Sequence, residues 1–161
     1  MFKKIIFMTT LATLSPSWVS AADDARAAIH ITANIPNKQF HVQPRNPDFG
    51  KDEVMHFNPV TRKLTPLRQT FDVKHTEGSV HAYLDGPSFL YNGWNPILLL
   101  ISFNNVVLNA TPQEVVDDAT STPGMQAEMV ISAPIPLTPL QTGLYTGDIT
   151  VIFDAVPRVT L

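Results

Sequence analysis

Residues Ala27–Pro36, AAIHITANIP, alternate strictly between apolar and polar side chains and end at a proline. Because successive side chains point to opposite faces of a strand, this pattern predicts one apolar and one polar face. The apolar face carries Ile29, Ile31, Ala33 and Ile35. Such a strand can open an ordinary sandwich, or it can fill a groove in another copy of the chain. The rest of the sequence favours the second interpretation.

A secretory signal peptide is predicted in front of this strand, with a positive end, an apolar run over residues 5–14 and small residues before the cleavage site. The apolar run is too short to cross a bilayer, which takes about 20 residues. Cleavage is predicted after Ala21, with Ala22 as the second choice. We therefore predict three parts: a signal peptide over residues 1–21, an N-terminal extension with the alternating strand over 22–36, and one sandwich domain over 37–161.

Composition excludes several classes of function. The 161 residues suit one domain, and a hydrophobic content of 44% is enough for a core. The 14 prolines, against 7 glycines, favour short strands joined by stiff loops. A net charge of −3 without long basic runs indicates no nucleic-acid partner. The absence of cysteine excludes disulfides, thiol chemistry and cysteine-bound metals.

Short alternating segments recur along the chain between turn signals. Two of them, residues 71–75 and 80–84, flank the turn Glu77-Gly78, which predicts a hairpin. The most hydrophobic run, Ile97–Phe103, predicts a central strand that is buried on both faces. The same kind of alternation continues to Phe153. About seven or eight short strands in such an arrangement are typical of an all-β sandwich.

One short helix is predicted to begin at Thr111. Threonine can cap a helix, Pro112 suits the first helical position, and Glu114 completes a capping box. The loop-like residues 120–124 limit this helix to about two turns. Within it, the pair Asp117-Asp118 resembles an acidic helix end more than a catalytic pair.

Nothing in the sequence marks a catalytic or metal site. The 5 histidines show no helical i,i+4 spacing and no His-Glu-x-x-His motif. His75 and His81 flank the predicted hairpin and are the pair that can meet across it. A Gly-x-Ser-x-Gly motif is absent as well. We therefore predict a protein that is not an enzyme and that uses no metal and no cofactor.

Four features together resemble a known family. They are IHITANIP (Ile29–Pro36), the block from HFNPVTRKL to FDVKHT (His56–Thr76), TPQEVVDDA (Thr111–Ala119), and MVISAPIP followed by GLYTGDITVIF (Met129–Phe153). In order and spacing they are similar to the major fimbrial subunits of the colonization-factor-antigen type, the alpha fimbriae of the alternate chaperone–usher pathway. The likeness covers nearly the whole chain behind the leader.

The resemblance implies an incomplete immunoglobulin-like sandwich that lacks its last strand. The N-terminal extension of the next copy supplies that strand, which is called donor-strand exchange. The resemblance also implies a place in a cell-surface fimbrium that adheres to host cells, reached by export through the periplasm. The implied partners are identical subunits, a periplasmic chaperone, an outer-membrane usher and a tip adhesin. The tail from Val156 runs past the family's expected end, which leaves open whether it pairs with the chain's own sheet.

A groove that accepts the donor strand needs an apolar floor. Its candidate residues are Phe71, Val73, Leu99, Ile101, Phe103, Ile149, Val151 and Phe153. The small Ala33 indicates a shallow pocket that sets the register of the donor strand, so a large residue there should impair polymerisation. Tyr145 is expected to pack its ring and to hydrogen-bond the backbone at a strand corner.

Two other functions remain open at the level of sequence. The chain can be a secreted monomeric sandwich that binds carbohydrate or a host protein, because Trp94 in YNGWNP lies beside asparagines that suit sugars. A tryptophan at this place can also simply cap the sandwich. The chain can, further, be a minor pilus subunit. A heat-stable ladder of polymers on gels separates a polymerising pilin from a monomeric binding module.

Overall fold

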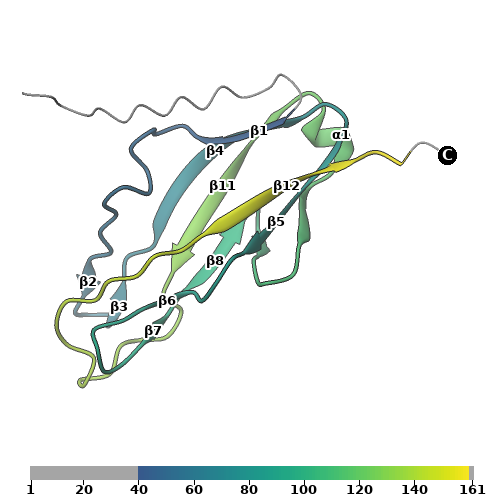
Figure 1. Ribbon diagram of the computed structural model, residues 1–161. Helices are drawn as coiled ribbons and strands as arrows, with labels where there is room; N and C mark the ends of the chain where they lie inside the picture. The colour runs from purple at the N-terminus through teal and green to yellow at the C-terminus, as the bar shows by residue number, and fades with distance from the viewer. Residues whose placement is uncertain (1–39, 160–161) are drawn as a thin grey trace, which may run out of the picture. The chain divides into compact units, whose positions relative to one another are not determined.

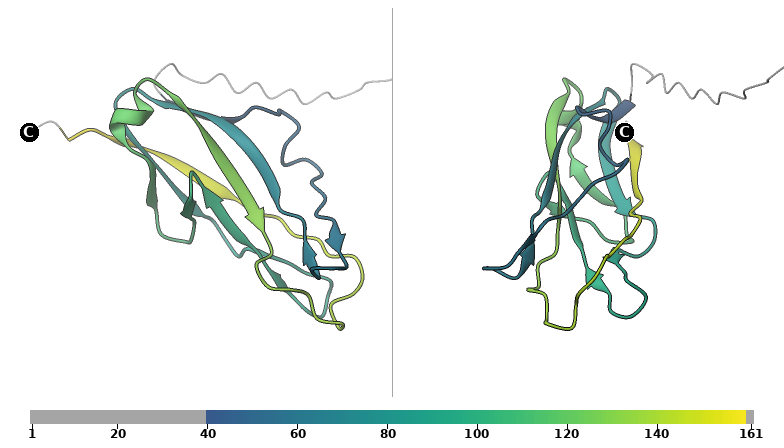
Figure 2. Two further views of the ribbon diagram at one scale, coloured as in Figure 1. Left: turned by 180° about the vertical axis from the view of Figure 1, so that it is seen from behind. Right: turned by 90° about the vertical axis from the view of Figure 1, so that its left-hand side faces the viewer.

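The computed structural model describes residues 40–159, which all belong to one compact unit of the chain, residues 34–161. Two antiparallel sheets pack face to face (Figures 1 and 2). The larger sheet has the order β1 (Phe40–Pro44), β4 (Leu67–His75), β11 (Met125–Ser132), β8 (Leu100–Phe103), β9 (Val106–Val107). The smaller has the order β10 (Gln113–Val116), β5 (Gly78–Leu84), β12 (Val151–Pro157). The predicted all-β, immunoglobulin-like sandwich is confirmed.

Two short ribbons and one helical turn complete the described residues. The ribbons are β2 (Phe57–Asn58) with β3 (Lys63–Leu64), and β6 (Phe89–Leu90) with β7 (Ile97–Leu98). The helical turn is α1 (Asp118–Ser121). Between residues 40 and 159, no helix has the length and apolar character needed to cross a membrane.

Three phenylalanines join the two sheets in the core. Phe103 of β8 is 0% exposed, and its ring centroid lies 5.5 Å from that of Phe71 in β4. Phe153 of β12, in the opposite sheet, lies 4.9 Å from Phe103 and 6.2 Å from Phe71. The two pairs that Phe103 makes are edge-to-face, an arrangement that adds to the stability from burial alone. The cluster therefore holds β12 against the larger sheet.

The turn at Glu77 joins two strands as predicted, but it does not form a hairpin. β4 pairs with β1 and β11, whereas β5 pairs with β10 and β12, so the chain crosses here from one sheet to the other. A glycine is needed after the turn, because a Cβ at Gly78 would fall on the carbonyl oxygen of Val156. The inward-facing residues on both sides of the turn are buried as the alternation predicts.

The prediction of one strand over Ile97–Phe103, buried on both faces, is wrong. Leu98 and Leu100 are exposed, whereas the alternate residues face the core. The run also splits at Leu99, whose backbone N–H donates to the carbonyl of Ser88 at 2.9 Å while the Ser88 hydroxyl donates to the Leu99 carbonyl at 3.1 Å. The cause is that only one face of β8 is covered by the second sheet.

The prediction of a helix from Thr111 is also wrong. Residues 113–116 form β10, and Val115 and Val116 are buried in the core. Burying two valines contributes more than a capping box, which is worth about 1 kcal/mol. The helical turn begins later, where the Asp117 side chain accepts the backbone N–H of Thr120 at 2.8 Å. Asp117 and Asp118 therefore lie at the start of this helical turn, not within a helix that begins at Thr111.

Candidate functional site: an open groove between two sheet edges

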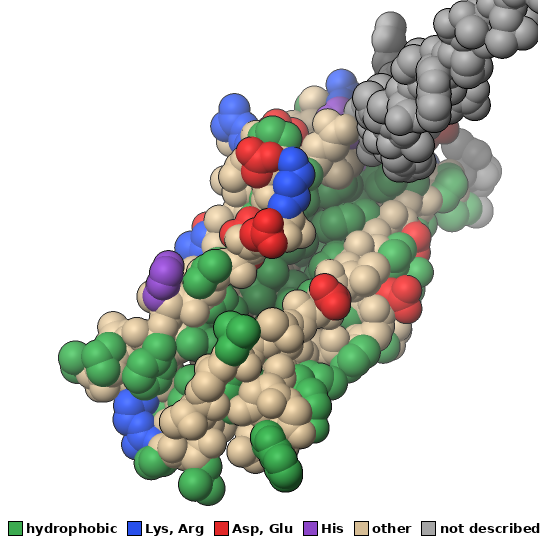
Figure 3. Space-filling model, turned by 60° about the vertical axis from the view of Figure 1, so that its left-hand side comes forward, with side chains coloured by type: hydrophobic (Ala, Val, Ile, Leu, Met, Phe, Trp, Pro, Cys, Tyr) green, Lys and Arg blue, Asp and Glu red, His purple; other side chains and the backbone are tan. Residues whose placement is uncertain are grey.

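The strand order leaves a groove between the two sheets. β1 is an edge strand of the larger sheet and β12 an edge strand of the smaller one. The segment after β1 and the segment that leads into β12 line a groove of ≈ 1300 Å³. In the right-hand view of Figure 2 these segments run along opposite sides of the opening. Figure 3 shows the hollow with hydrophobic side chains along its floor.

Both walls of the groove offer backbone that lacks a neighbouring strand. β12 pairs with β5 on one side and with no other strand among residues 40–159. On the opposite wall, residues 52–55 join no strand ladder in the described part of the chain. A strand edge exposed in this way attracts further strands, and proteins usually cover or distort such edges. The groove is therefore a place where one more strand can pair on both sides.

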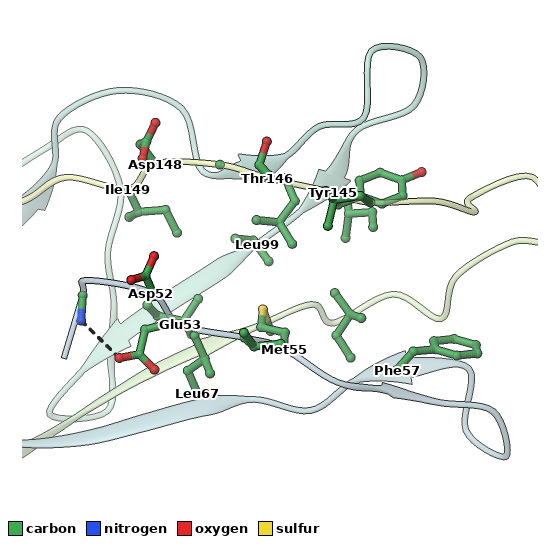
Figure 4. Close-up of a pocket in the computed structure, with 18 of the residues that line it drawn as sticks. Asp52, Glu53, Met55, Phe57, Leu67, Leu99, Tyr145, Thr146, Asp148 and Ile149 are labelled. Carbon is green, nitrogen blue, oxygen red and sulfur yellow. Dashed lines mark hydrogen bonds between the residues drawn. The ribbon is translucent and has the colours of Figure 1, made fainter. Parts of the chain in front are cut away.

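The floor of the groove is apolar, and charged side chains of both signs, including Lys51 and Arg62, lie among its lining residues. Leu67, Phe71 and Leu99 line the groove, and Phe71 and Leu99 also belong to the buried core. Figure 4 shows Asp52 and Glu53 on one rim and Asp148 on the other. Glu53 is held in place because its Oε1 accepts the backbone N–H of Gly50 at 3.1 Å. The arrangement suits an amphipathic strand with its apolar side chains directed inward.

The turn at the start of the first wall is fixed by an ion pair. Lys51 Nζ lies 2.6 Å from Asp48 Oδ1, and this hydrogen bond lowers the pKa of the Asp48 carboxyl. The Asn46 side chain accepts the backbone N–H of Asp48 at 3.1 Å. Phe49, which follows, packs edge-to-face on Phe71 with ring centroids 6.0 Å apart. The turn therefore directs the chain away from β1 and along the groove.

The predicted acceptor residues divide into two groups. Five of them line the groove: Phe71, Leu99, Ile149, Val151 and Phe153. The other three lie in the buried core and do not line the groove: Val73, Ile101 and Phe103. The predicted donor residues lie outside the described residues: Ile29, Ile31, Ala33 and Ile35. The role of both sets in strand exchange stays a prediction.

Sequence reasoning missed most of the first wall. Phe49, Met55 and Phe57 line the groove, although none of them was a predicted site residue. The signal available in the sequence was the alternation of Met55 with Phe57, which indicates a strand. Whether such a strand pairs with a neighbour or borders an opening depends on contacts that are distant in sequence.

Two predictions about single aromatic residues are wrong. The Tyr145 ring packs against the core as expected, but its hydroxyl is buried and has no hydrogen-bond partner in the part of the chain that the structure describes. Trp94 does not cap the sandwich, because it is 86% exposed. Both residues lie at one end of the groove, where Tyr145 lines the wall and Asn92, close to Trp94, donates to the Thr142 carbonyl at 3.1 Å.

His75 and His81 do not meet, because the turn between them crosses from sheet to sheet. His75 is buried and its Nδ1 lies 3.0 Å from the Ser79 carbonyl oxygen. His81 Nε2 lies 3.9 Å from a carboxylate oxygen of Glu114. Residues 40–159 contain no group of three or more side chains placed to hold a metal ion.

The tail pairs with the chain's own sheet as far as the structure describes it. Val156 and Pro157 pair with Ser79 and Gly78, and the Arg158 N–H donates to the Glu77 carbonyl at 2.6 Å. The Arg158 guanidinium binds the Asp118 carboxylate through two contacts of 2.5 and 2.6 Å. The end of β12 is thereby tied to α1.

Comparisons with known proteins agree with this architecture. The structure is similar to the CooA pilin subunit from enterotoxigenic Escherichia coli, with a TM-score of 0.58 over 73% of this chain and 90% of that chain. The sequence identity is 16%, so this likeness concerns the fold. No curated protein sequence matches the chain significantly.

The family model described as CS1 type fimbrial major subunit matches residues 25–154, which is most of the chain. Subunits of this family are structural pilins that polymerise into a surface fimbrium, and they are not enzymes. The resemblance found in the sequence is confirmed by this match. The chain therefore belongs to the CS1-type fimbrial major subunits and is a subunit of a pilus.

Proposed function

We propose that the groove accepts the N-terminal extension of another copy of the chain by donor-strand exchange. The observation that supports this most is an apolar groove whose two walls both offer backbone without a neighbouring strand in the described part of the chain. Residues 49–57 and 145–153 border the opening on its two sides. The predicted donor strand, residues 29–35, would span about 23 Å as an extended strand. The strand fits between the walls with its apolar face on the floor.

Burial of the donor side chains would contribute to holding the polymer together. Ile29, Ile31 and Ile35 would contribute about 1.5–3 kcal/mol each on leaving water, or about 5–9 kcal/mol together before ordering costs. Backbone hydrogen bonds to both walls add to this sum, because they also remove two exposed strand edges. Side-chain pockets on the floor set the register, with Ala33 at the shallow one.

Repetition of this contact produces a fibre. Donor and acceptor surfaces differ, so the interface is heterologous and generates an open head-to-tail polymer. In this scheme residues 1–21 direct export into the periplasm, residues 22–36 carry the donor strand, and residues 37–161 form the acceptor domain. A periplasmic chaperone would cover the groove before assembly, an outer-membrane usher would assemble the fibre, and a tip adhesin would support adhesion to host cells.

Deletion of residues 22–36 tests the proposal. The shortened chain should remain folded but should join no polymer, and a synthetic peptide of residues 24–37 should bind to it. A control peptide of the same composition, in which the apolar residues of the strand are moved by one position so that they alternate on the opposite face, should not bind. Polymers formed by the shortened chain, or equal binding of both peptides, would contradict donor-strand exchange. Binding is measured by calorimetry and assembly by heat-stable ladders on gels.

A second function is favoured by one observation, the exposure of Trp94. An exposed tryptophan beside asparagines suits a sugar ring, so the subunit could itself bind carbohydrate. This function does not exclude polymerisation. Glycan binding by the assembled fibre that disappears in a Trp94→Ala variant would support it.

A further inference from the structure

The end of the sandwich away from α1 carries exposed apolar side chains on three separate loops (Figure 1). Val60 lies between β2 and β3, Trp94 lies between β6 and β7, and Leu140 and Leu144 lie between β11 and β12. These four side chains are 90%, 86%, 81% and 83% exposed, in that order, and we call them the apolar tip. Single exposed apolar residues are common on proteins, but a group of them marks an interaction site.

Hydrogen bonds hold the three loops in one arrangement. The Leu137 N–H donates to the Arg62 carbonyl at 2.6 Å, and the Arg62 guanidinium donates back to the Leu137 carbonyl. Gln141 Nε2 donates to the Pro96 carbonyl at 3.2 Å. The segment before β12 is therefore bonded to both of the other loops, so the tip is a fixed surface that three parts of the chain build together.

Trp94 is held away from the core rather than left loose. The Asn92 Oδ1 accepts the backbone N–H groups of both Trp94 and Asn95 at 3.0 Å. Gly93 has a φ of 95°, a conformation that favours glycine, and its carbonyl accepts the Tyr91 hydroxyl at 2.7 Å. A side chain fixed in this way loses little further freedom when a partner covers it, which favours binding.

Charge at this end is sparse and of one sign. The segments that build it, residues 54–64, 86–98 and 133–147, contain no Asp or Glu, although the chain has 14 acidic residues and a net charge of −3. Their two Lys or Arg residues are Arg62 and Lys63. On the face that Figure 3 shows, hydrophobic and basic side chains lie at the lower end, and the acidic side chains lie farther up. The tip is therefore apolar and basic on a protein that is acidic as a whole.

This charge pattern decides which partner fits the tip. A second copy stacked head to tail would present its α1 end, where Arg158 and Asp118 form an ion pair and Asp117 adds another carboxylate. Burying such charged groups against apolar side chains is unfavourable. An anionic lipid surface offers both chemistries that the tip needs, acyl chains for the apolar side chains and negative headgroups for Arg62 and Lys63.

We propose that the apolar tip binds the surface of a lipid bilayer that contains anionic headgroups. Trp94 then lies at the level of the headgroups, where tryptophan is enriched in membrane-bound proteins. Leu140 and Leu144 enter the boundary with the acyl chains, and Lys63 reaches the negative headgroups beside Val60. The contact uses loops and not the strand edges of the groove, so it goes beyond donor-strand exchange and does not require it.

Trp94 supplies its own reporter for the test. Of the 2 tryptophans, Trp18 lies in the predicted leader, so a chain that begins at Ala22 contains Trp94 alone. This chain is mixed with vesicles of phosphatidylcholine and phosphatidylglycerol in equal amounts. We expect the Trp94 fluorescence to move to shorter wavelength, and lipid with brominated acyl chains to quench it. An unchanged emission spectrum, or no quenching by brominated lipid, would overturn the proposal.

Two substitutions separate the apolar and the electrostatic parts of the contact. Leu140→Ser removes an apolar side chain of the tip, and Lys63→Gln removes a positive charge beside it; each should weaken sedimentation with the vesicles several-fold. The matched controls are Val107→Ser, at an exposed residue of β9, and Lys74→Gln, beside Gly124 at the α1 end. Both controls should bind as the parent does. Equal losses in variants and controls would show that the tip has no special part in binding.

The remaining outcomes identify other partners. Equal binding to vesicles of phosphatidylcholine alone would overturn the assigned headgroup chemistry. Binding that appears only when the vesicles contain a glycolipid, and that the free sugar removes, would assign Trp94 to carbohydrate and overturn the lipid contact. Failure of the chain to form fibres would count against donor-strand exchange alone, because vesicle binding is measured without reference to the polymer.

Discussion

Phe103 is one of the side chains through which the larger sheet contacts β12, a wall of the groove. It is fully buried, and its closest ring neighbour is Phe153 on β12, which lines the groove. The groove is therefore built directly on the core, and its shape depends on residues that the incoming strand does not touch. This explains how a residue can be essential to the site without lining it.

Replacement of Phe103 by alanine tests this dependence. A cavity of that size in a packed core should lower the free energy of unfolding by about 3–5 kcal/mol. Phe89→Ala, at a partly exposed aromatic residue outside the cluster, should cost clearly less. Urea denaturation of both variants, made in the chain without residues 22–36, gives the comparison. Equal losses would show that the ring cluster has no special part in stability.

Asp118 makes the stability of the fold depend on pH in the acidic range. Hydrogen bonding from Arg158 lowers the pKa of its carboxyl below the ordinary value of 3.8. Because the folded pKa is depressed, the stabilisation is complete above the ordinary pKa and is lost as pH falls through the lowered pKa. Asp118→Asn should therefore be less stable than the parent at neutral pH, and the difference should vanish in strong acid.

Thermal unfolding across this acidic range measures the effect of Asp118. Arg158→Gln removes the other partner of the ion pair and should follow the same pH profile. The double variant should lose no more stability at neutral pH than the larger of the two single losses. Additive losses would mean that the two side chains act independently.

The predicted donor strand alternates apolar and polar side chains, so under donor-strand exchange its two faces should respond differently to substitution. Ile31→Asp places a charge on the predicted inward face, where an unpaired buried carboxylate is strongly unfavourable, and should abolish heat-stable polymers. Thr32→Asp adds the same charge one residue later on the outward face and should leave the ladder on gels nearly intact. Loss of polymers in both variants would indicate a general effect of charge rather than strand insertion.

Strands were predictable where burial of one of their two faces explains the alternation of apolar and polar residues. The strands flanking Glu77 and the strand that ends at Pro157 lie where alternation and the final proline indicate. Residues 111–116 were mispredicted because the capping signal is local, whereas the burial of Val115 and Val116 depends on β5, about 30 residues earlier in the chain. Local propensity is a weak guide once tertiary burial opposes it.

In the whole molecule, donor-strand exchange predicts that the lone domain is less stable than the domain in the fibre. A ligand that binds only the folded state stabilises it, by about 2.7 kcal/mol at a hundredfold excess over the dissociation constant. The chain without residues 22–36 should therefore unfold at a lower temperature than subunits in the polymer, and addition of the residue 24–37 peptide should recover part of the difference. Calorimetry measures both. A shortened chain as stable as the polymer would contradict a groove that needs filling.

The amino-acid sequence alone was enough to predict the all-β domain and its family, because these depend on period, order and composition along the chain; the amphipathic N-terminal strand stays a prediction. Tertiary contacts determined which strands became edges, that the segment from Phe49 to Phe57 borders the groove, and that Trp94 projects from its end. The physical reason is that alternation records which side of a strand is buried but not what buries it. Pairing partners are chosen by packing between residues far apart in the sequence, and that choice appears only when the two sheets have come together.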